Sequence, residues 1–393
     1  MDTRTGLPVV GMVGGGQLAR MTHQAAIALG QSLRVLALSP EDGAALVAAD
    51  VRIGRHDDLA ALREFAKGCD VVTFDHEHVP GDLIRALAAE GHTVLPGADA
   101  LRFAQNKRAM REHLGALGFP MPQWSATDPA AFGDKVGWPV IVKTATGGYD
   151  GRGVFVAASA ADIPASVDVV VEELVPLKRE LAAVVARSPL GQIAAYPIVE
   201  TVQQAGICVE VLAPAPGLDE DLAVRAQRLA IDVAVALGVV GVLAVELFET
   251  TDGRLLVNEL AMRPHNSAHW TIEGARTSQF EQHLRAVLDY PMGETRMTAP
   301  AVVMANVLGR QDRPVDAAQG RPAQGGGKPG GMSIDERLHH LFAEEPGAKV
   351  HLYGKQVRPG RKIGHVTVLG DDLEDCRRRA RRAARILEEG YQH

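Results

Sequence analysis

Two glutamates, Glu246 and Glu259, have the types and the spacing that point most directly to chemistry. Each lies in an apolar stretch, and Asp252-Gly253 between the stretches predicts a hairpin turn that places two strands side by side. Two carboxylates on an otherwise apolar sheet repel each other and resist ionising, and a divalent cation removes that cost. Mg²⁺ prefers a few carboxylates together with phosphate oxygens. The pattern therefore predicts a magnesium site, to which Asn258 can add an oxygen.

A lysine followed by a glycine-rich loop forms a second candidate. Lys143 ends an apolar stretch, and residues 147–153 contain four glycines. A buried lysine is costly unless its charge meets an anion, and a loop of this composition can fold its amides over phosphates. The alternatives are a strand-end lysine that reaches solvent and a loop that is merely flexible. Three polar residues inside the loop add groups that a flexible linker would not need: Tyr149, Asp150 and Arg152.

Acidic residues at the end of another apolar stretch suggest a nucleotide. The backbone near Glu172 could meet the edge of a planar base, and Glu180, eight residues further on, could accept hydrogen bonds from ribose hydroxyls. A pair of exposed acids is the alternative for both.

A dense polar run follows the second of the two metal strands. Arg263 could clamp a carboxylate or a transferring phosphoryl group. His265 and His269 could act as neutral hydrogen-bond donors, and their spacing does not suit zinc. Further on, four cations on a Gly/Pro-shaped loop suggest a phosphate pocket, with a solvated basic turn as the alternative: Lys355, Arg358, Arg361 and Lys362.

The elements that must position these residues begin with an alternation of strands and helices. Short apolar runs in the first hundred residues, joined by helical segments such as 17–29, predict a parallel sheet covered by helices. Gly14-Gly15-Gly16-Gln17 follows the first strand. Three interpretations of this turn stay open: a tight turn that only packs, an NAD site, or an anion site that uses Gln17 and the helix N-terminus.

The middle and the end of the chain have a different pattern. We expect a helix that opens at Asn106-Lys107, antiparallel strands over 180–186 and 193–201, and helices over 219–237 and 372–389. The last helix carries an arginine cluster, which we interpret as a solvated helix face rather than a nucleic-acid site. The segment 311–331 is rich in Gly, Pro, Gln and Ala and predicts a flexible insertion.

Composition limits the possible classes. The chain has 393 residues, a formal net charge of −7 and three scattered cysteines. The net charge argues against general nucleic-acid or anionic-membrane binding, and no apolar run reaches the roughly 18 residues of a membrane span. Three scattered cysteines suggest neither a disulfide framework nor a metal cluster. We expect a cytoplasmic protein.

Five strings together resemble one family of the ATP-grasp superfamily. They are Gly14-Gly15-Gly16-Gln17-Leu18; Val142-Lys143 with Gly147-Gly148-Tyr149-Asp150-Gly151-Arg152-Gly153; Val257-Asn258-Glu259-Leu260-Ala261; Arg263-Pro264-His265-Asn266-Ser267 with His269-Trp270-Thr271; and Arg358-Pro359-Gly360-Arg361-Lys362-Ile363-Gly364-His365. The chain is similar nearly end to end, apart from 311–331, to the N5-carboxyaminoimidazole ribonucleotide synthetases of purine biosynthesis.

The resemblance implies a mixed α/β and α+β architecture. A Rossmann-like pre-ATP-grasp domain would span 1–104, an ATP-grasp domain 105–300 with its nucleotide lid at about 120–200, and a small β-rich domain 301–393. It also implies a reaction in which ATP, bicarbonate and 5-aminoimidazole ribonucleotide give ADP, phosphate and the N5-carboxylated nucleotide. Bicarbonate would attack the γ-phosphate to give carboxyphosphate, and that anhydride, or CO₂ released from it, would carboxylate the amine. Two Mg²⁺ ions and a homodimer are further implications.

Site residues carry over by matching position. Lys107 and Lys143 would hold the ATP phosphates, Glu172 and the Val175 backbone would face adenine, and Glu180 would face the ribose. The resemblance also assigns Gly148, Gly151, Glu173 and Asn258 to the ATP site and Glu246 and Glu259 to Mg²⁺. Bicarbonate and the acceptor amine would be surrounded by Tyr149, Asp150, Arg152, Arg263, His265 and Asn266. The aminoimidazole ribonucleotide would be held by Gln17, Asp75, Glu77, Lys355, Arg358, Arg361 and Lys362.

One string departs from the family pattern. Where the family often has Thr-x-Glu-x-Glu, this chain has Thr73-Phe74-Asp75-His76-Glu77. Asp75 is one methylene shorter than the usual acid, His76 replaces an aliphatic residue, and Glu77 matches the second acid. The nearest alternative is another ATP-grasp ligase, such as a formate-dependent phosphoribosylglycinamide transformylase, which should lack the 358–365 string. A dehydrogenase and an ATP-sensing protein are alternatives from other classes.

Overall fold

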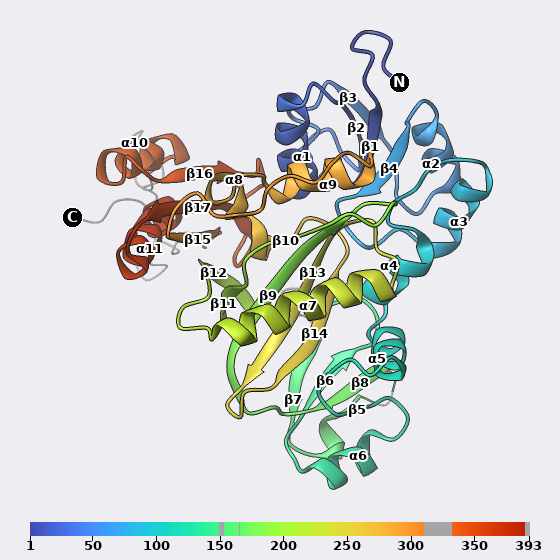
Figure 1. Ribbon diagram of the computed structural model, residues 1–393, viewed down its shortest axis with the longest axis vertical. Coiled ribbons are helices and arrows are strands. Elements are labelled where there is room, and N and C mark those ends of the chain that lie inside the picture. The colour runs from blue at the N-terminus through green and yellow to red at the C-terminus, as the bar shows by residue number, and fades with distance from the viewer. Residues whose placement is uncertain (149–152, 165, 310–331, 390–393) are drawn as a thin grey trace, which may run out of the picture.

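The computed structural model describes residues 1–148, 153–164, 166–309 and 332–389. Within these ranges its strands form three sheets (Figure 1). Two predicted features lie outside the described residues: the loop residues Tyr149, Asp150, Gly151 and Arg152, and the insertion at 311–331. No helix in the described ranges combines the length and the apolar character that a membrane crossing requires.

The first sheet is parallel and has the order β3-β2-β1-β4. Its strands are β1 (Val9–Val13), β2 (Ser32–Ala37), β3 (Asp50–Ile53) and β4 (Val71–Phe74), and its helices are α1 (Gln17–Ala28), α2 (Leu59–Ala66), α3 (Gly81–Ala89) and α4 (Ala98–Gln105). Every residue of β1 and β4 is buried, as expected for strands covered on both faces. The order reverses at β1, and ligands of such sheets bind beyond the carboxyl ends of the strands at this point. Gly14 and Asp75 follow β1 and β4 there.

The second sheet is small and antiparallel, with the order β5-β8-β6-β7. Its elements are α5 (Lys107–Ala116), β5 (Trp124–Ser125), α6 (Pro129–Val136), β6 (Val140–Thr144), β7 (Val154–Ala157), η1 (Ala160–Asp162) and β8 (Val169–Glu173). Helix α5 begins after Asn106, whose side chain accepts a hydrogen bond from the Ala109 N–H at 3.0 Å. This confirms the predicted helix start. In the register of β6 with β8, Ile141 lies opposite Glu172, which places Lys143 diagonally next to Glu172 on one face.

The third sheet has nine strands and forms the centre of the molecule. Its order is β14-β13-β9-β11-β12-β15-β17-β16, and β10 pairs with β9. The strands are β9 (Leu177–Arg187), β10 (Ile193–Ala195), β11 (Val199–Gln204), β12 (Ile207–Ala213), β13 (Gly241–Thr250), β14 (Leu255–Ala261), β15 (Ala301–Leu308), β16 (Lys349–Leu352) and β17 (Lys362–Gly370). The predicted hairpin is confirmed as β13–β14. Since β12 pairs with β15, the sheet runs without a break across the boundary expected at residue 300.

Helices cover this sheet on the sides drawn in Figure 1, where α7 crosses β9 and β13 and where α9 lies beside α1. They are α7 (Glu220–Ala236), α8 (Thr271–Gly274), α9 (Gln279–Val287), α10 (Ile334–Glu344) and α11 (Leu373–Glu389), with a short η2 (Asn266–Ala268). Helix α7 is capped by Asp219, and it buries small side chains such as Ala226 and Ala230, so the helix can lie close to the sheet.

The interpretation of the α11 arginines as a solvated face is wrong for three of them. Arg377 and Arg381 donate to Glu210 of β12, at 2.8 and 2.9 Å, and Arg379 donates to Glu345 at 2.9 Å. Both carboxylates are about 5% exposed. The sequence separation between these partners hid the pairs, which hold α11 against the sheet and against the end of α10.

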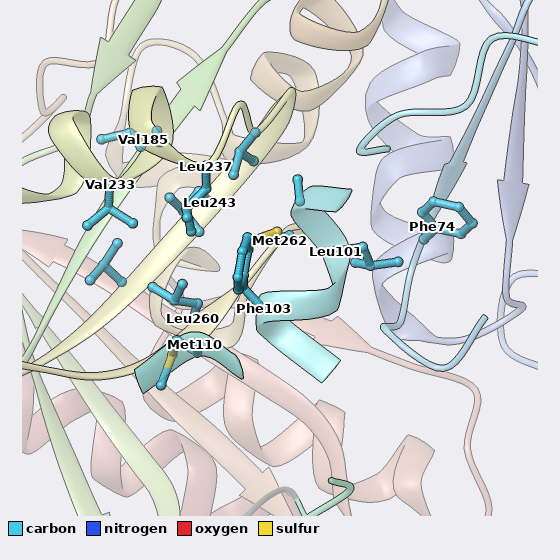
Figure 2. Packing of buried hydrophobic residues seen from close by; sticks show 14 of the residues in the cluster. Phe74, Leu101, Phe103, Met110, Val185, Val233, Leu237, Leu243, Leu260 and Met262 are labelled. Atoms are coloured by element: carbon cyan, nitrogen blue, oxygen red, sulfur yellow. The ribbon is translucent and has the colours of Figure 1, made fainter. Parts of the chain in front are cut away.

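A continuous apolar core joins the parallel sheet to the large sheet (Figure 2). Phe74 and Leu101 lie on the side of the parallel sheet, and Phe103 of α4 reaches Leu260 and Met262 near β14. Burial of an aromatic or large aliphatic side chain contributes roughly 1.5–3 kcal/mol. The strand that carries Glu259 is thus fixed against the first 105 residues of the chain.

Candidate active site

The predicted carboxylate pair is the centre of the site. Glu246 on β13 and Glu259 on β14 lie directly opposite each other in the register, just before a β-bulge. Burial, followed by the charges of Glu259 and Glu180, raises the pKa of Glu246 to about 7. The Nε2 of His265 lies 3.4 Å from Glu246 Oε1. Glu180 of β9 lies opposite Phe248 of β13 in the register. Burial and the charge of Glu259 also raise the pKa of Glu180.

This arrangement fits Mg²⁺. Glu246 and Glu259 lie opposite each other on an otherwise apolar sheet and hinder each other's ionisation, which a cation between them would relieve; the raised pKa of Glu246 agrees with this. In the described part of the chain, no three His, Cys, Asp or Glu side chains gather as they would for an all-protein metal site. Two carboxylates completed by phosphate oxygens and water are the usual environment of Mg²⁺ at nucleotide sites.

Lys143 connects this pair to the small sheet. Its side chain is 4% exposed, which excludes the solvent-reaching alternative. The Nζ donates to Asn258 Oδ1 at 2.7 Å and lies 3.0 Å from Glu172 Oε2. Burial alone would raise the pKa of Glu172, but the charges of Lys143 and Arg111 outweigh it and hold that pKa below its ordinary value. Glu172 is therefore a buried carboxylate between two cations, and the exposed-acid alternative is wrong for it.

Lys107 approaches the carboxylate pair from the start of α5. Its Nζ lies 3.6 Å from Glu259 Oε1 and 3.4 Å from the carbonyl oxygen of Gly147. It thus lies between β14 and the start of the glycine-rich loop, in which Gly148 adopts a φ of +78°. The structure brings Lys107, Lys143 and Glu259 together as the sequence predicts.

The strand end beyond Glu172 is arranged differently. Glu173 accepts hydrogen bonds from the Gln123 N–H at 2.9 Å and from Gln123 Nε2 at 3.2 Å. Its carboxylate thus ties β8 to the segment that enters β5. Val175 follows in the partly buried link between β8 and β9.

The polar run after β14 reaches the parallel sheet and the later strands. Arg263 Nε donates to Glu77 Oε2 at 2.7 Å. Asn266 and Asn306 of β15 exchange two amide hydrogen bonds, at 3.0 and 2.8 Å. Burial, with the charges of Arg263 and Lys362, lowers the pKa of His265 well below its usual range, so this imidazole is neutral.

The glycine turn after β1 is built around Asp75. The Gly16 N–H donates to Asp75 Oδ2 at 2.7 Å. A Cβ on Gly14 would lie 1.6 Å from Asp75 Oδ1, and Gly14 has a φ of +113°, so the position requires glycine. Burial raises the pKa of Asp75 to about 6, although the Gly16 N–H and the charge of Arg263 act in the opposite direction. The shorter acid thus binds the turn itself.

Of the four cations of the basic loop, two interact with the groups described above and two bond within their own loop. Lys355 donates to the side chain of Gln17 at the start of α1. Lys362 begins β17, and its charge acts on Glu246 and His265. Arg358 and Arg361 donate to Gln356 of their own loop, at 3.3 and 3.4 Å.

Two residues were missed by the sequence analysis. Arg111 is fully buried and contacts both the small sheet and β14. Its position four residues after Lys107 places both side chains on one face of α5, and this spacing was the available signal. Asn306 had no comparable signal, because its partner Asn266 is far away in the sequence.

The fold and the site define an enzyme of the ATP-grasp class. A family model described as the ATP-grasp domain matches residues 112–280, and the ribonucleotide synthetase preATP-grasp domain matches 7–105. The phosphoribosylaminoimidazole carboxylase C-terminal domain matches 302–379. This last match covers the basic loop, in which a formate-dependent transformylase should differ, and it therefore favours the synthetase.

Known proteins match over nearly the full chain. A curated N5-carboxyaminoimidazole ribonucleotide synthase of Mycobacterium tuberculosis is 58% identical over 395 residues, covering 98% of this chain and 88% of the relative. The crystal structure of N5-carboxyaminoimidazole ribonucleotide synthetase from Thermotoga maritima is 35% identical with a TM-score of 0.83, covering 97% and 99% of the two chains. The N5-carboxyaminoimidazole synthase of Aspergillus clavatus, in complex with ADP and 5-aminoimidazole ribonucleotide, is 31% identical with a TM-score of 0.84, covering 97% and 98%.

The chain belongs to the N5-carboxyaminoimidazole ribonucleotide synthase family, whose members are ATP-dependent ligases.

Proposed function

We propose that this protein uses ATP and bicarbonate to carboxylate the amine of 5-aminoimidazole ribonucleotide, a step of purine biosynthesis. Bicarbonate attacks the γ-phosphorus, the bond to the β–γ bridging oxygen breaks, and ADP and carboxyphosphate form. The amine nitrogen then attacks the carboxyl carbon of carboxyphosphate, or CO₂ released from it. The nitrogen loses a proton, and phosphate leaves either at this attack or earlier, when CO₂ is released.

The observation that carries the proposal is that cations from separate parts of the fold act on one carboxylate pair. Lys107 and Lys143 come from α5 and the small sheet, and Lys362, at the start of β17, acts on Glu246. ATP and the aminoimidazole ribonucleotide both carry phosphate, so both need cations. ATP and the aminoimidazole ribonucleotide, if they meet at the carboxylate pair, would each find cations for their phosphates.

We assign the nucleotide to the small-sheet side. Lys143 and Lys107 hold the phosphates, and the glycine-rich loop from Gly148 and Gly151 covers them. The adenine lies against the Glu172 and Glu173 strand end and the Val175 backbone, and Glu180 accepts from the ribose. Apart from Gly148, the described members of this group lie on α5, β6, β8 and β9 and in the link between β8 and β9, and Lys143 donates to Asn258 of β14.

Mg²⁺, proposed as two ions, would be held by Glu246 and Glu259 and would neutralise charge on the ATP phosphates. The described side chains position the other groups. Arg263, held by Glu77, presents its remaining N–H groups to bicarbonate or to the phosphoryl group. His265, neutral and next to Glu246, can donate one hydrogen bond without adding charge. Asn266 is oriented by Asn306. Tyr149, Asp150 and Arg152 complete the proposed set.

The acceptor nucleotide is assigned to the crevice beyond β1. Gln17, Asp75 and Glu77 line this end of the parallel sheet, and Lys355 reaches it from the C-terminal strands. Lys355, Arg358, Arg361 and Lys362 are proposed to hold its phosphate. We further propose that the enzyme works in the cytoplasm as a homodimer. The three cysteines are free thiols, which fits a reducing compartment.

An ADP-release assay tests this function. ADP formation should require the aminoimidazole ribonucleotide and should fall to a low background when either that nucleotide or bicarbonate is left out. Formate with glycinamide ribonucleotide should not replace them. ADP release that the aminoimidazole ribonucleotide does not stimulate would contradict the proposal.

A further inference from the structure

Arg111 joins the two sheets that enclose the proposed ATP site. Its Nε donates to Glu172 Oε1 of β8 at 2.9 Å. Its Nη1 and Nη2 donate to the carbonyl oxygens of Val257 and Asn258 of β14, each at 2.8 Å. One planar guanidinium therefore connects the small sheet to the strand that carries Glu259.

The burial of Arg111 makes these contacts energetically important. The side chains of Arg111 and Glu172 are 0% and 2% exposed. A buried arginine with an ion-pair partner and two carbonyl acceptors is well satisfied, whereas removal of one member of a buried pair leaves an uncompensated charge. Lysine cannot replace this geometry fully, since it lacks the rigid planar fork.

The charge balance around Glu172 gives Arg111 a second consequence. Glu172 contacts two cations, Arg111 at 2.7 Å and Lys143 at 3.0 Å. These three side chains together therefore carry a net charge of +1. If Arg111 were absent, Lys143 and Glu172 would form a neutral pair, and the attraction of Lys143 for a phosphate would fall. Arg111 thus compensates Glu172 and leaves the charge of Lys143 available for an anion.

We propose that Arg111 is a positioning residue for ATP: it balances the charge of Glu172, so that the charge of Lys143 is available to a phosphate, and it sets the small sheet against strand β14, which carries Glu259. This inference rests on the proposed function only for the identity of the nucleotide. It assigns Arg111 no contact with substrate.

The test is a double-mutant cycle on nucleotide binding. ADP affinity by calorimetry and the KM for ATP are measured for the wild-type protein, Arg111→Met, Glu172→Gln and the double variant. Arg111→Met should weaken nucleotide binding by about tenfold or more while changing kcat less. The double variant, in which Lys143 regains its unopposed charge, should bind better than Arg111→Met alone. A purely structural arginine predicts the opposite, because the second substitution removes yet another contact.

Two further variants complete the experiment. Arg108→Met alters a half-exposed arginine one turn away on α5 and should bind ADP as the wild type does. Arg111→Lys, which keeps the charge, should recover most of the nucleotide affinity, and it carries the test if the methionine variant does not fold. Wild-type ADP affinity in Arg111→Met, equal loss in the lysine and methionine variants, or strictly additive losses in the cycle would overturn the inference. An absence of aminoimidazole-dependent turnover in the wild type would count against the proposed function alone, since ADP affinity is measured separately.

Discussion

Glu246 is protonated more readily than an ordinary carboxyl group, because burial and the charges of Glu259 and Glu180 raise its pKa to about 7. Lys143 and Lys362 act in the opposite direction. At the scale of single residues, the site is thus a group of carboxylates on which nearby lysines act. The proposed Mg²⁺ would bind the carboxylates, and the lysines would bind the phosphates of ATP.

The first prediction concerns Glu259, the proposed metal ligand on β14. Glu259→Gln keeps the shape of the side chain but removes a charged oxygen ligand, so ATP turnover should fall by on the order of 100-fold or more. The measurement is steady-state ADP formation at saturating Mg²⁺.

The control lies in the same hairpin. Asp252→Asn changes an exposed acid in the β13–β14 turn and should leave the rate near that of the wild type. A Glu259→Gln variant with near-normal turnover would remove Glu259 from the site.

At the scale of elements, the βα turn after β1 and helix α9 decide how the parallel sheet meets the large sheet. Asp75 fills the space beside Gly14 and Gly16, and the turn has no room for a side chain. On α9, His283 lies between the sheets: Thr73 Oγ1 of β4 is 2.9 Å from its Nε2, and the Val242 N–H of β13 donates to its Nδ1 at 3.2 Å.

The second prediction is that Gly14→Ala destabilises the protein and impairs the acceptor site. A Cβ at this position would collide with the carboxylate of Asp75, and the φ of +113° disfavours alanine. We expect a loss of about 2 kcal/mol or more in the free energy of unfolding by urea, together with a raised KM for the aminoimidazole ribonucleotide.

Gly97→Ala is the matched control. This glycine precedes α4 with a φ of −70°, and an added Cβ would meet nothing within 4 Å. Equal effects of the two alanines on stability would show that Gly14 has no special requirement.

The third prediction is a pH dependence of stability caused by His283. Burial lowers the pKa of this histidine from 6.5 to about 4. The unfolded chain therefore binds a proton between these pH values that the folded chain does not bind. Stability should fall as the pH is lowered from 6.5 to about 4, by roughly 3 kcal/mol from this group. Protonation of Nδ1 would also break the bond from Val242.

The His283→Gln variant isolates this effect. Glutamine does not titrate in the range, so its free energy of unfolding should fall less steeply than that of the wild type across the same pH interval. Urea unfolding at several pH values measures both curves. Parallel curves would mean that His283 does not contribute.

The elements were largely predictable from local pattern, whereas their long-range pairing was not. The hairpin with Glu246 opposite Glu259 followed from apolar alternation and the Asp252-Gly253 turn, and the start of α5 followed from Asn106. The pairing of β12 with β15 joins segments almost a hundred residues apart and leaves no local signal.

The same limit explains the residues that were missed. The side chain of Arg111 on α5 contacts the carboxylate of Glu172 on β8 and the backbone carbonyl of Asn258 on β14, so only the folded chain shows that Arg111 is buried. Lys143 was identified because the glycine-rich loop follows it directly. Glu210 could not be matched to Arg377 from the sequence, since any of many acids could have been the partner.

At the scale of the whole molecule, the site is assembled from all three sheets. Lys355, in the loop between β16 and β17, donates to Gln17 of the first helix, and Arg263 after β14 donates to Glu77 after β4. Figure 1 shows how this is possible: β15 to β17 extend the central sheet past α1 and α9. Both proposed nucleotides can therefore lie against one carboxylate pair.

The fourth prediction concerns assembly. We expect a homodimer in solution, with a mass twice the 41.8 kDa of the chain. Sedimentation velocity over a range of protein concentrations measures this mass. A species that stays at the mass of one chain at every concentration would contradict the proposal.

The central claim, that bicarbonate is activated as carboxyphosphate for the amine of the aminoimidazole nucleotide, is tested most directly with oxygen-labelled bicarbonate. The γ-phosphoryl group is transferred to a bicarbonate oxygen, so the account predicts that this label is found in the inorganic phosphate. It also predicts that the label is found in the new N-carboxylate. Mass spectrometry of the two products reads both. Phosphate that acquires its oxygen from water, or a nucleotide that gains no carboxylate while ADP is released, would contradict the account.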